Sequence, residues 1–320
     1  MNYIGSKKQL LDFIETTIKE KIDSLEDKVF CDLFAGTGVV GEHFKNRVKK
    51  VIANDIEPYA YTIIYNKIKN SSTYDLDSLV YEPKEGFIYK NYAEKRSYFS
   101  KENAKKIDGL RESIEKSFTC KDMSEEEYHY CLASLLFSAD RVANTTGVYG
   151  SYLKKLKFMA KSEMELLPHT FKPSTKKHEV YNQDANTLIK TIEGDILYID
   201  PPYNHRQYGL NYHILNTIVQ DKAFEPRGKS GFDDYIRSDY CKKTKVAEAL
   251  EQLIKDAKFK YIFLSYSNDG ILDKISIKKI MSSYGSYSLK EFNHHRYRVN
   301  KKSKKGHVVE QLHVVIKDDM

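Results

Sequence analysis

Tryptophan is absent from the 320 residues of the chain, and cysteine, proline and glycine are scarce, with 4, 7 and 15 residues. The cysteines are scattered without a Cys-x-x-Cys pair, so no zinc site is expected and reduced thiols are the simplest interpretation. No apolar run approaches the ~18 residues that span a membrane, and the first residues lack a signal-peptide pattern. These absences predict a cytoplasmic protein without a membrane span, and no metal is expected.

The composition that remains is typical of a folded protein with a basic surface. Hydrophobic residues make up 41% of the chain and the formal net charge is +7. A chain of this length can form a main domain with one sizeable insertion. Lysines cluster at 154–157 and at 301–305. Such clusters are compatible with a polyanionic partner, and equally with a solvated surface.

The most informative stretch is Asp200-Pro201-Pro202-Tyr203, which follows the apolar run 194–199. The run reads as a buried strand, and the prolines end it because they cannot donate to a sheet ladder. The tetrapeptide is therefore a rigid loop at the carboxyl end of a strand, where ligands bind in open α/β sheets. A carboxylate, proline carbonyls and a phenol ring together suit a planar exocyclic amine.

A second pattern indicates a nucleotide-like cofactor. Residues 29–38 read as a strand running into the turn Gly36-Thr37-Gly38, and an amphipathic helix begins at Val39. A second strand, 51–53, ends in Asn54-Asp55, where a carboxylate can accept hydrogen bonds from a ribose. The pattern is half of a Rossmann-like fold. It leaves NAD and S-adenosylmethionine (SAM) both open, and Asp55 as the cap of a following helix is the structural alternative.

The N-terminal segment 2–7, Asn-Tyr-Ile-Gly-Ser-Lys, precedes apolar residues at helical spacing. Ser6 is predicted to cap this helix, which places Lys7 in its first turn. The helix dipole disfavours a cation there, so Lys7 predicts an anionic ligand nearby. A frayed basic N-terminus is the alternative.

The middle of the chain shows no βαβ repeat between 71 and 175. Helices are predicted at 101–118 and 124–143, followed by a polar loop at 144–152. The tyrosines and small polar side chains of this loop, together with Lys154 and Lys155 that follow it, could meet phosphates and unstacked bases. We therefore predict an inserted, mainly helical target-recognition region at 71–175, and a catalytic domain formed by 1–70 and 176–320.

The sheet pattern resumes at 178–181, where a strand precedes Asp184, and continues with a buried strand at 260–267. Helices are predicted at 246–257 and 271–283. The segments 286–292 and 310–316 read as an antiparallel hairpin at the sheet edge. The predicted fold class is α/β, with a Rossmann-like sheet that carries helices on both faces.

Five segments taken together, 2–7, 32–38, 54–55, 184 and 200–203, resemble the alpha group of N6-adenine-specific DNA methyltransferases. The order of the motifs matches, and residues 204–218 are similar to methylases of type II restriction-modification systems. The resemblance covers both ends of the chain and leaves 71–175 weakly constrained. It implies SAM as the cofactor, double-stranded DNA as the substrate and a restriction endonuclease as a possible partner.

The resemblance also implies roles for particular residues. Gly36, Gly38 and the backbone of Phe34 would border the methionine part of SAM, with Lys7 near its carboxylate. Asp55 would bind the ribose and Asp184 the adenine amine. The implied site comprises the catalytic residues Asp200, Pro201, Pro202 and Tyr203, and the cofactor-binding residues Tyr3, Lys7, Asp32, Phe34, Gly36, Gly38, Asp55 and Asp184.

Candidate DNA contacts come from the basic segments and polar loops. These are Asn144, Tyr149, Lys154, Arg206, Lys301 and Lys302. Asp at position 200 disfavours a cytosine-N4 enzyme, for which Ser is typical. An RNA methylase, and a catalytically silent DNA-binding subunit on the same fold, stay as alternatives.

Overall fold

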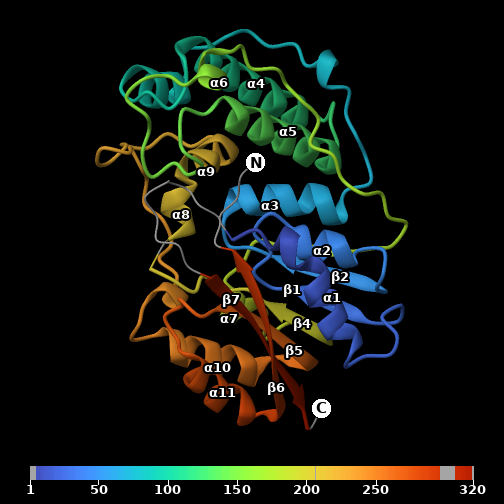
Figure 1. The fold of residues 1–320 in the computed structure, drawn as a ribbon. Helices are drawn as coiled ribbons and strands as arrows, with labels where there is room; N and C mark the ends of the chain where they lie inside the picture. The colour runs from blue at the N-terminus through green and yellow to red at the C-terminus, as the bar shows by residue number, and fades with distance from the viewer. Residues whose placement is uncertain (1–4, 206, 296–306, 319–320) are drawn as a thin grey trace. The chain divides into compact units, whose positions relative to one another are not determined.

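The computed structural model describes residues 5–205, 207–295 and 307–318 (Figure 1). These residues form two compact units, each assembled from separate stretches of the chain. Unit 1 contains Gly5, Glu57–Pro173 and Tyr208–Ile236. Unit 2 contains Ser6–Ile56, Ser174–Gln207 and the described residues from Arg237 onwards. Each unit has its own hydrophobic cluster.

Unit 2 is built on a seven-stranded sheet with the order β3-β2-β1-β4-β5-β7-β6. The strands β1 to β5 run parallel, so their carboxyl ends lie along one edge of the sheet. The strands are β1 (Val29–Asp32), β2 (Lys50–Asn54), β3 (Glu179–Tyr181), β4 (Glu193–Ile199), β5 (Lys258–Ser267), β6 (Gly285–His295) and β7 (His307–Lys317). The predicted Rossmann-like α/β sheet is confirmed.

Helices cover both faces of this sheet because successive side chains of a strand point to opposite sides. On one face, Phe30 of β1 stacks on Phe44 of α2 with ring centroids 4.4 Å apart. On the other face, Cys31 and Leu33 join a cluster built with α7, α10 and α11. The helices and helical turns of unit 2 are η1 (Lys7–Leu10), α1 (Leu11–Lys19), α2 (Val39–Phe44), α7 (Ala185–Leu188), η5 (Asp239–Cys241), α10 (Val246–Asp256) and α11 (Lys274–Ser282).

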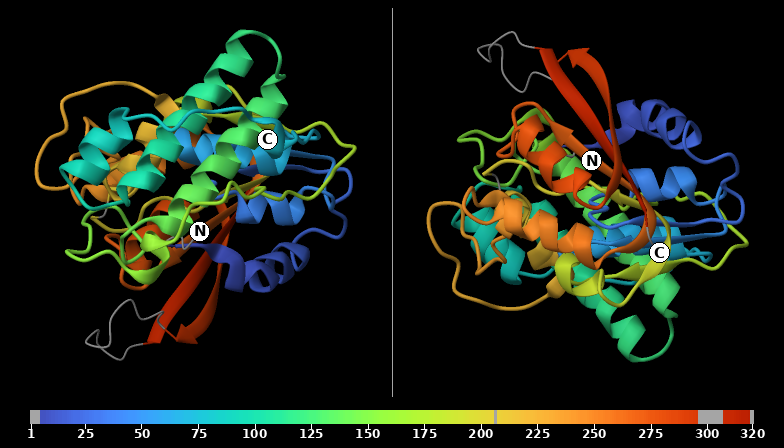
Figure 2. Two further views of the ribbon diagram at one scale, coloured as in Figure 1. Left: turned by 90° about the horizontal axis from the view of Figure 1, so that it is seen from above. Right: turned by 90° about the horizontal axis from the view of Figure 1, so that it is seen from below.

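The C-terminal hairpin forms one side of the sheet, as the sequence predicted. Figure 2 shows β6 and β7 as two long strands side by side. The last strand, β7, pairs antiparallel with both β5 and β6, so β6 forms the edge. The register places Glu310 of β7 opposite Ser267, the last residue of β5. Glu310 therefore lies level with the carboxyl ends of the parallel strands, next to the end of β5.

Unit 1 is mainly helical and has an aromatic core. Its two long helices, α4 (Lys101–Thr119) and α5 (Glu125–Val142), match the predicted ranges within one residue at either end. Ser124 and Glu127 form a capping box at the start of α5. The other elements are α3 (Pro58–Ile64), η2 (Tyr65–Lys69), η3 (Leu76–Ser78), η4 (Tyr89–Glu94), α6 (Phe158–Lys161), α8 (Tyr208–Asn211) and α9 (His213–Gln220). Both η2 and η4 are π-helical.

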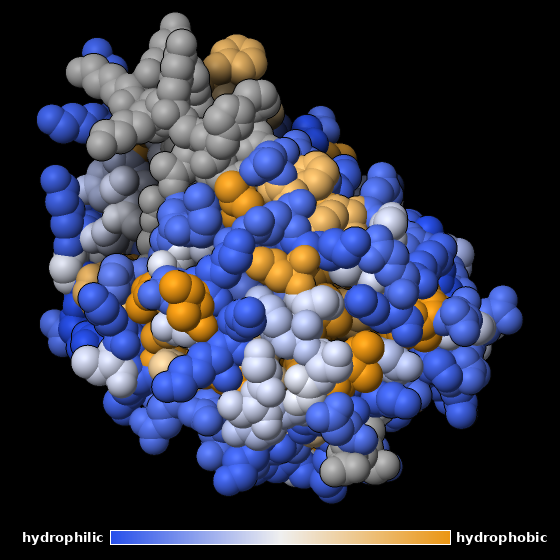
Figure 3. Space-filling model, turned by 60° about the horizontal axis from the view of Figure 1, so that its bottom comes forward, coloured by the Kyte–Doolittle hydropathy of each residue, from blue (hydrophilic) through white to orange (hydrophobic). Residues whose placement is uncertain are grey.

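No helix in the described part of the chain is long and apolar enough to cross a membrane. The face of the molecule in Figure 3 is mostly hydrophilic, with apolar side chains in small separate groups. The four cysteines are free thiols. The described residues contain no group of three or more His, Cys, Asp or Glu side chains that could hold a metal ion.

Candidate active site

The Asp-Pro-Pro-Tyr segment leaves the sheet where β4 ends at Ile199. Asp200 is the first residue beyond the strand, and its side chain is only 16% exposed. The backbone oxygen of Tyr203 accepts a hydrogen bond from the amide of Ile271, which fixes the far end of the loop. The loop is therefore anchored at both ends, and it holds a carboxylate in a nearly dry position at the carboxyl edge of the sheet.

A buried lysine faces this carboxylate. The Nζ atom of Lys7 lies 3.1 Å from Oδ1 of Asp200 and 3.6 Å from Oε2 of Glu310. The side chains of Lys7 and Glu310 are 5% and 9% exposed. Lys7 therefore lies between two carboxylates contributed by distant parts of the chain. The anions beside Lys7 in the structure are these two side chains, and an anionic ligand near Lys7 stays a prediction.

Burial and charge act in opposite directions on these groups. Burial raises the pKa of Asp200, the charge of Lys7 lowers it and the charge of Glu310 raises it again, with a resulting pKa of about 6. For Lys7, burial lowers the pKa, but the charges of Asp200 and Glu310 more than compensate and hold it well above its usual value. At neutral pH the cluster thus contains an ammonium ion beside an ionised Asp200.

The ring of Tyr203 lies against the same cluster. The Lys7 ammonium is 5.4 Å from the centre of this ring, within the range of a cation–π contact. The ring of Tyr266 lies 5.6 Å away on the sheet side. Burial, only partly opposed by the charge of Lys7, raises the pKa of Tyr203 to about 12, so the phenol stays neutral. The structure thus brings the predicted residues Lys7, Asp200 and Tyr203 together.

The glycine turn after β1 is organised by the acid at the tip of β2. Gly36 and Gly38 both have positive φ, 53° and 69°, a conformation that residues with a Cβ seldom adopt. The amide of Gly36 donates to Oδ2 of Asp55 at 2.8 Å. The helix α3 has Glu57 at its N-cap, and no side-chain cap bond forms there. Asp55 therefore supports the glycine turn and does not cap this helix.

Two neighbouring polar residues also act on this turn. Oδ2 of Asp32 accepts a hydrogen bond from the amide of Gly41 in α2. Burial raises the pKa of Asp32 to about 7, although the Gly41 hydrogen bond opposes the shift. Asn54 is buried and its side-chain amide donates to the carbonyls of Leu33 and Gln183. These hydrogen bonds tie the ends of β1 and β2 to the loop after β3.

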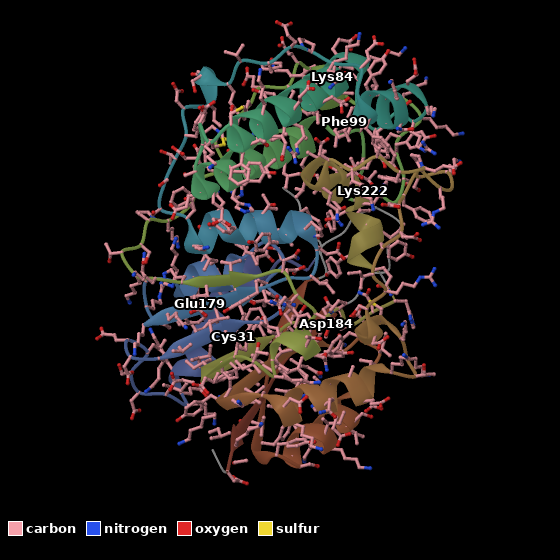
Figure 4. The ribbon with its side chains drawn as sticks, turned by 180° about the vertical axis from the view of Figure 1, so that it is seen from behind. Cys31, Lys84, Phe99, Glu179, Asp184 and Lys222 are labelled. Carbon is pink, nitrogen blue, oxygen red and sulfur yellow. The ribbon has the colours of Figure 1, made fainter. Side chains whose placement is uncertain are left out.

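Asp184 lies in that loop, at the start of α7 (Figure 4), and its side chain is exposed. Its carboxylate accepts a hydrogen bond from the amide of Thr187 at 2.9 Å. Phe34 packs edge-on against Tyr240, with ring centroids 5.1 Å apart. The hydroxyl of Tyr240 donates to Oδ1 of Asn186 at 2.7 Å, which holds the Tyr240 ring against Phe34.

The capping prediction for the N-terminal helix was wrong. Ser6 precedes a short 3₁₀ turn, η1, and makes no side-chain cap hydrogen bond there. Lys7 does lie in the first turn, as predicted, and its partners come from β7 and from the loop after β4. Tertiary contacts thus determine the position of Lys7.

The candidate DNA contacts in unit 1 have different environments. Asn144 and Tyr149 are fully buried. The Asn144 amide donates to the carbonyls of Ser97 and Leu153, and the Tyr149 hydroxyl donates to Asp140 at 3.1 Å. Lys154 is exposed. The remaining predicted residues Tyr3, Arg206, Lys301 and Lys302 lie outside the described residues.

Two residues of the site gave no clear signal in the sequence. Glu310 is one of several polar residues in a strand that also carries Gln311 and His313, and Tyr240 lies in a segment where the sequence predicts no helix or strand. Only the strand register of the hairpin could have placed Glu310 opposite the end of β5.

The comparison with known proteins agrees with this geometry. The model of a family described as D12 class N6 adenine-specific DNA methyltransferase matches residues 3–282. The type II methyltransferase M.NlaIII of Neisseria lactamica is 46% identical over 99% of both chains. M.CviAII of Paramecium bursaria Chlorella virus 1 is 36% identical over 93% of both chains. M.FokI of Planomicrobium okeanokoites is 35% identical over 99% of this chain, which spans 53% of that longer relative.

These matches confirm the resemblance found in the sequence and do not favour the RNA, cytosine-N4 or silent-subunit alternatives. They also confirm an enzyme, with S-adenosylmethionine as its methyl donor. The family match covers most of the chain, including the glycine turn and the Asp-Pro-Pro-Tyr loop. The chain therefore belongs to the D12 class of N6-adenine-specific DNA methyltransferases, and its relatives are the methyltransferases of type II restriction-modification systems.

Proposed function

We propose that the protein methylates the N6 amine of an adenine that has been flipped out of duplex DNA at a specific site. The observation that carries this proposal is the largely buried carboxylate of Asp200 just beyond β4, paired with Lys7 at 3.1 Å and close to the ring of Tyr203. A carboxylate acceptor beside a flat apolar ring suits an aromatic base with an exocyclic amine.

The amine of adenine is a poor nucleophile because its lone pair is delocalised into the ring. Lys7 pairs with Oδ1 of Asp200, which assigns the other carboxylate oxygen to one N–H of the amine. The carbonyl of Pro201 accepts the second N–H. Two acceptors favour a tetrahedral nitrogen with a localised lone pair, and the remaining requirement is in-line positioning.

Residues of the glycine turn fit the cofactor. The left-handed Gly36 and Gly38 let the backbone approach a ligand closely, and Asp55 lies at the strand tip where a ribose diol would bind. Phe34 would border the methionine part of SAM and Asp184 would accept from its adenine amine. When bound, SAM supplies an electrophilic methyl group on a sulfonium.

The base has to leave the helix, because its reacting atom is inaccessible within a duplex. Tyr203 would stack on the extruded adenine, a contact of about 1–3 kcal/mol. The ring of Tyr203 packs near Lys7 and Tyr266. Asp200 and Tyr203 thus recognise the amine and the face of the same base.

We assign methyl transfer to unit 2 and DNA recognition mainly to unit 1. In unit 1, Lys154 and Lys155 are exposed on the segment that leads to α6, where the ring of Phe158 is 83% exposed. Phosphates are contacted by such lysines, and apolar rings can contact bases. The buried Asn144 and Tyr149 shape this segment from within: the Asn144 side chain also accepts from the Lys157 amide at 3.0 Å.

The names of the relatives suggest a biological role for the methylation. M.NlaIII and M.CviAII are named type II methyltransferases. We propose that this chain likewise protects sites that a partner endonuclease would cut, and that it acts in the cytoplasm, where its DNA substrate is found.

The decisive experiment is to incubate the purified protein and SAM with unmethylated genomic DNA and to identify the modified base by mass spectrometry. We expect N6-methyladenine, and sequencing of the methylated DNA should return one recognition sequence. Total RNA and a duplex made only of G·C pairs, which contains cytosine but no adenine, serve as controls. Formation of N4-methylcytosine, or methylation of RNA alone, would contradict the proposal.

A further inference from the structure

We propose that Glu310 is a positioning residue for methyl transfer: it shares the Lys7 ammonium with Asp200 and so sets how strongly that ammonium neutralises the catalytic carboxylate. This inference rests on the proposed role of Asp200 and deepens it. Glu310 lies beyond residue 282, where the family match ends.

The fold gives Glu310 a defined position. It pairs across the sheet with Ser267 of β5 and with Phe292 of β6, so three strands fix its backbone. Its carboxylate is 9% exposed and its Oε2 atom lies 3.6 Å from Nζ of Lys7. The paired strand fixes the backbone of Glu310, so its carboxylate reaches Lys7 from a defined position in the sheet. The ammonium therefore lies between two carboxylates whose backbones are positioned by the sheet and by the loop after β4.

Three charges in so small and dry a volume interact strongly. One ammonium faces two carboxylates, so the cluster of Lys7, Asp200 and Glu310 carries a net negative charge when all three groups are ionised. The charge of Lys7 lowers the pKa of Asp200 and the charge of Glu310 raises it. A shared ammonium thus leaves Asp200 more basic than an exclusive ion pair would, which suits an acceptor of amine protons.

Within the described residues, few other ionisable groups surround Asp200. Tyr198 and Tyr203 face the cluster, and burial holds the pKa of both phenols above its usual value, so both are neutral at pH 7. Asp32, on the neighbouring strand β1, interacts with the charge of Asp200 and has a pKa of about 7. It titrates in the same range, so an experiment needs variants that change only Lys7 or Glu310.

The proposal predicts shifts of opposite sign. Replacing Glu310 by Gln removes a negative charge and leaves Lys7 to Asp200 alone, so the pKa of Asp200 should fall by about one unit. Replacing Lys7 by Met removes the positive charge, so this pKa should rise by about one unit or more. A merely structural contribution of Glu310 would lower activity equally at every pH.

The test measures single-turnover methylation between pH 5 and 9 with enzyme in excess of DNA and with saturating SAM. The acidic limb of the rate profile should move to lower pH in Glu310→Gln and to higher pH in Lys7→Met. Glu291→Gln is the matched control: Glu291 lies on β6 of the same hairpin and pairs with Lys274 at 3.0 Å. Its acidic limb should coincide with that of the wild type.

A second readout does not depend on activity. Carbon-13 NMR of labelled aspartate, with the Asp200 signal assigned from Asp200→Asn, reports the protonation of Asp200 in the protein alone. A lowered pKa in Glu310→Gln supports the proposal even if the DNA substrate was wrongly assigned. An unchanged or raised pKa of Asp200 in Glu310→Gln would overturn it.

Discussion

The two units bury polar groups of different kinds. Unit 2 places charged side chains at the carboxyl edge of its sheet, among them Lys7, Asp32 and Glu310. Unit 1 buries mostly neutral amides and tyrosines, such as Asn103, Asn144 and Tyr149. A buried charge is costly unless it is paired, whereas a fully hydrogen-bonded amide stabilises a fold. The contrast implies that unit 2 keeps its charges for chemistry and that unit 1 uses its amides for shape.

The largest expected effect comes from removing a charge at the catalytic site of unit 2. Asp200→Asn keeps the shape of the side chain but removes the charge that accepts from the amine. We expect methylation to fall by at least about 10³-fold while SAM affinity stays within a factor of about two, as for the loss of a principal electrostatic group. Transfer of tritium from labelled SAM and calorimetric titration measure the two quantities. Turnover close to that of the wild type would remove Asp200 from its assigned role.

The next effect concerns the cofactor. Asp55→Ala removes the acceptor of the Gly36 amide and, in the proposed complex, of two ribose hydroxyls. We expect SAM to bind about 10- to 100-fold more weakly, which corresponds to roughly 1.5–3 kcal/mol for the loss of charged hydrogen bonds. Calorimetry at several pH values checks this. Unchanged affinity would limit Asp55 to a structural role at the glycine turn.

A buried amide in unit 1, that of Asn144, tests whether such groups serve stability. Asn144→Ala removes an amide that joins Ser97, Leu153 and Lys157, so buried backbone groups lose their partners. We expect the free energy of unfolding to fall by about 1–3 kcal/mol. The same DNA sites should still be methylated. Thermal denaturation and methylome sequencing together test this. A new recognition sequence in a protein of unchanged stability would instead show that Asn144 contacts a base.

The smallest effect concerns the exposed lysines of unit 1. Replacing Lys154 and Lys155 by Gln should weaken binding to all duplexes alike. The slope of log K against log salt should fall by about 0.9 for each DNA phosphate that a lysine no longer neutralises. The control is Lys116→Gln, on the long helix α4. If the double variant keeps the wild-type slope, these lysines are only a solvated surface.

The sequence predicted the elements whose signals are local. The strand-ending acids at 55 and 200, the glycine turn, the long helices and the two strands of the C-terminal hairpin each give a signal within one continuous stretch of sequence. Two features that depend on contacts between distant residues were not predicted. The assignment of Tyr208–Ile236 to unit 1 follows from packing of Tyr212, Leu215 and Ile218 in its core. Glu310 is a member of the charged cluster only because β7 pairs with β5 in one register, since a shift by one residue turns a side chain to the other face.

The cluster of Lys7, Asp200 and Glu310 in unit 2 becomes complete only late in the synthesis of the chain. Its members Lys7, Asp200 and Glu310 come from the start, the middle and the end of the chain. A ribosome adds about 5–20 residues per second, and the N-terminal parts emerge first. Until β7 has emerged, β5 lacks one neighbouring strand and Lys7 lacks one of its two carboxylates. A nascent or truncated chain that already holds the glycine turn and the Asp-Pro-Pro-Tyr segment, but stops before β7, therefore still lacks one of the two carboxylates beside Lys7.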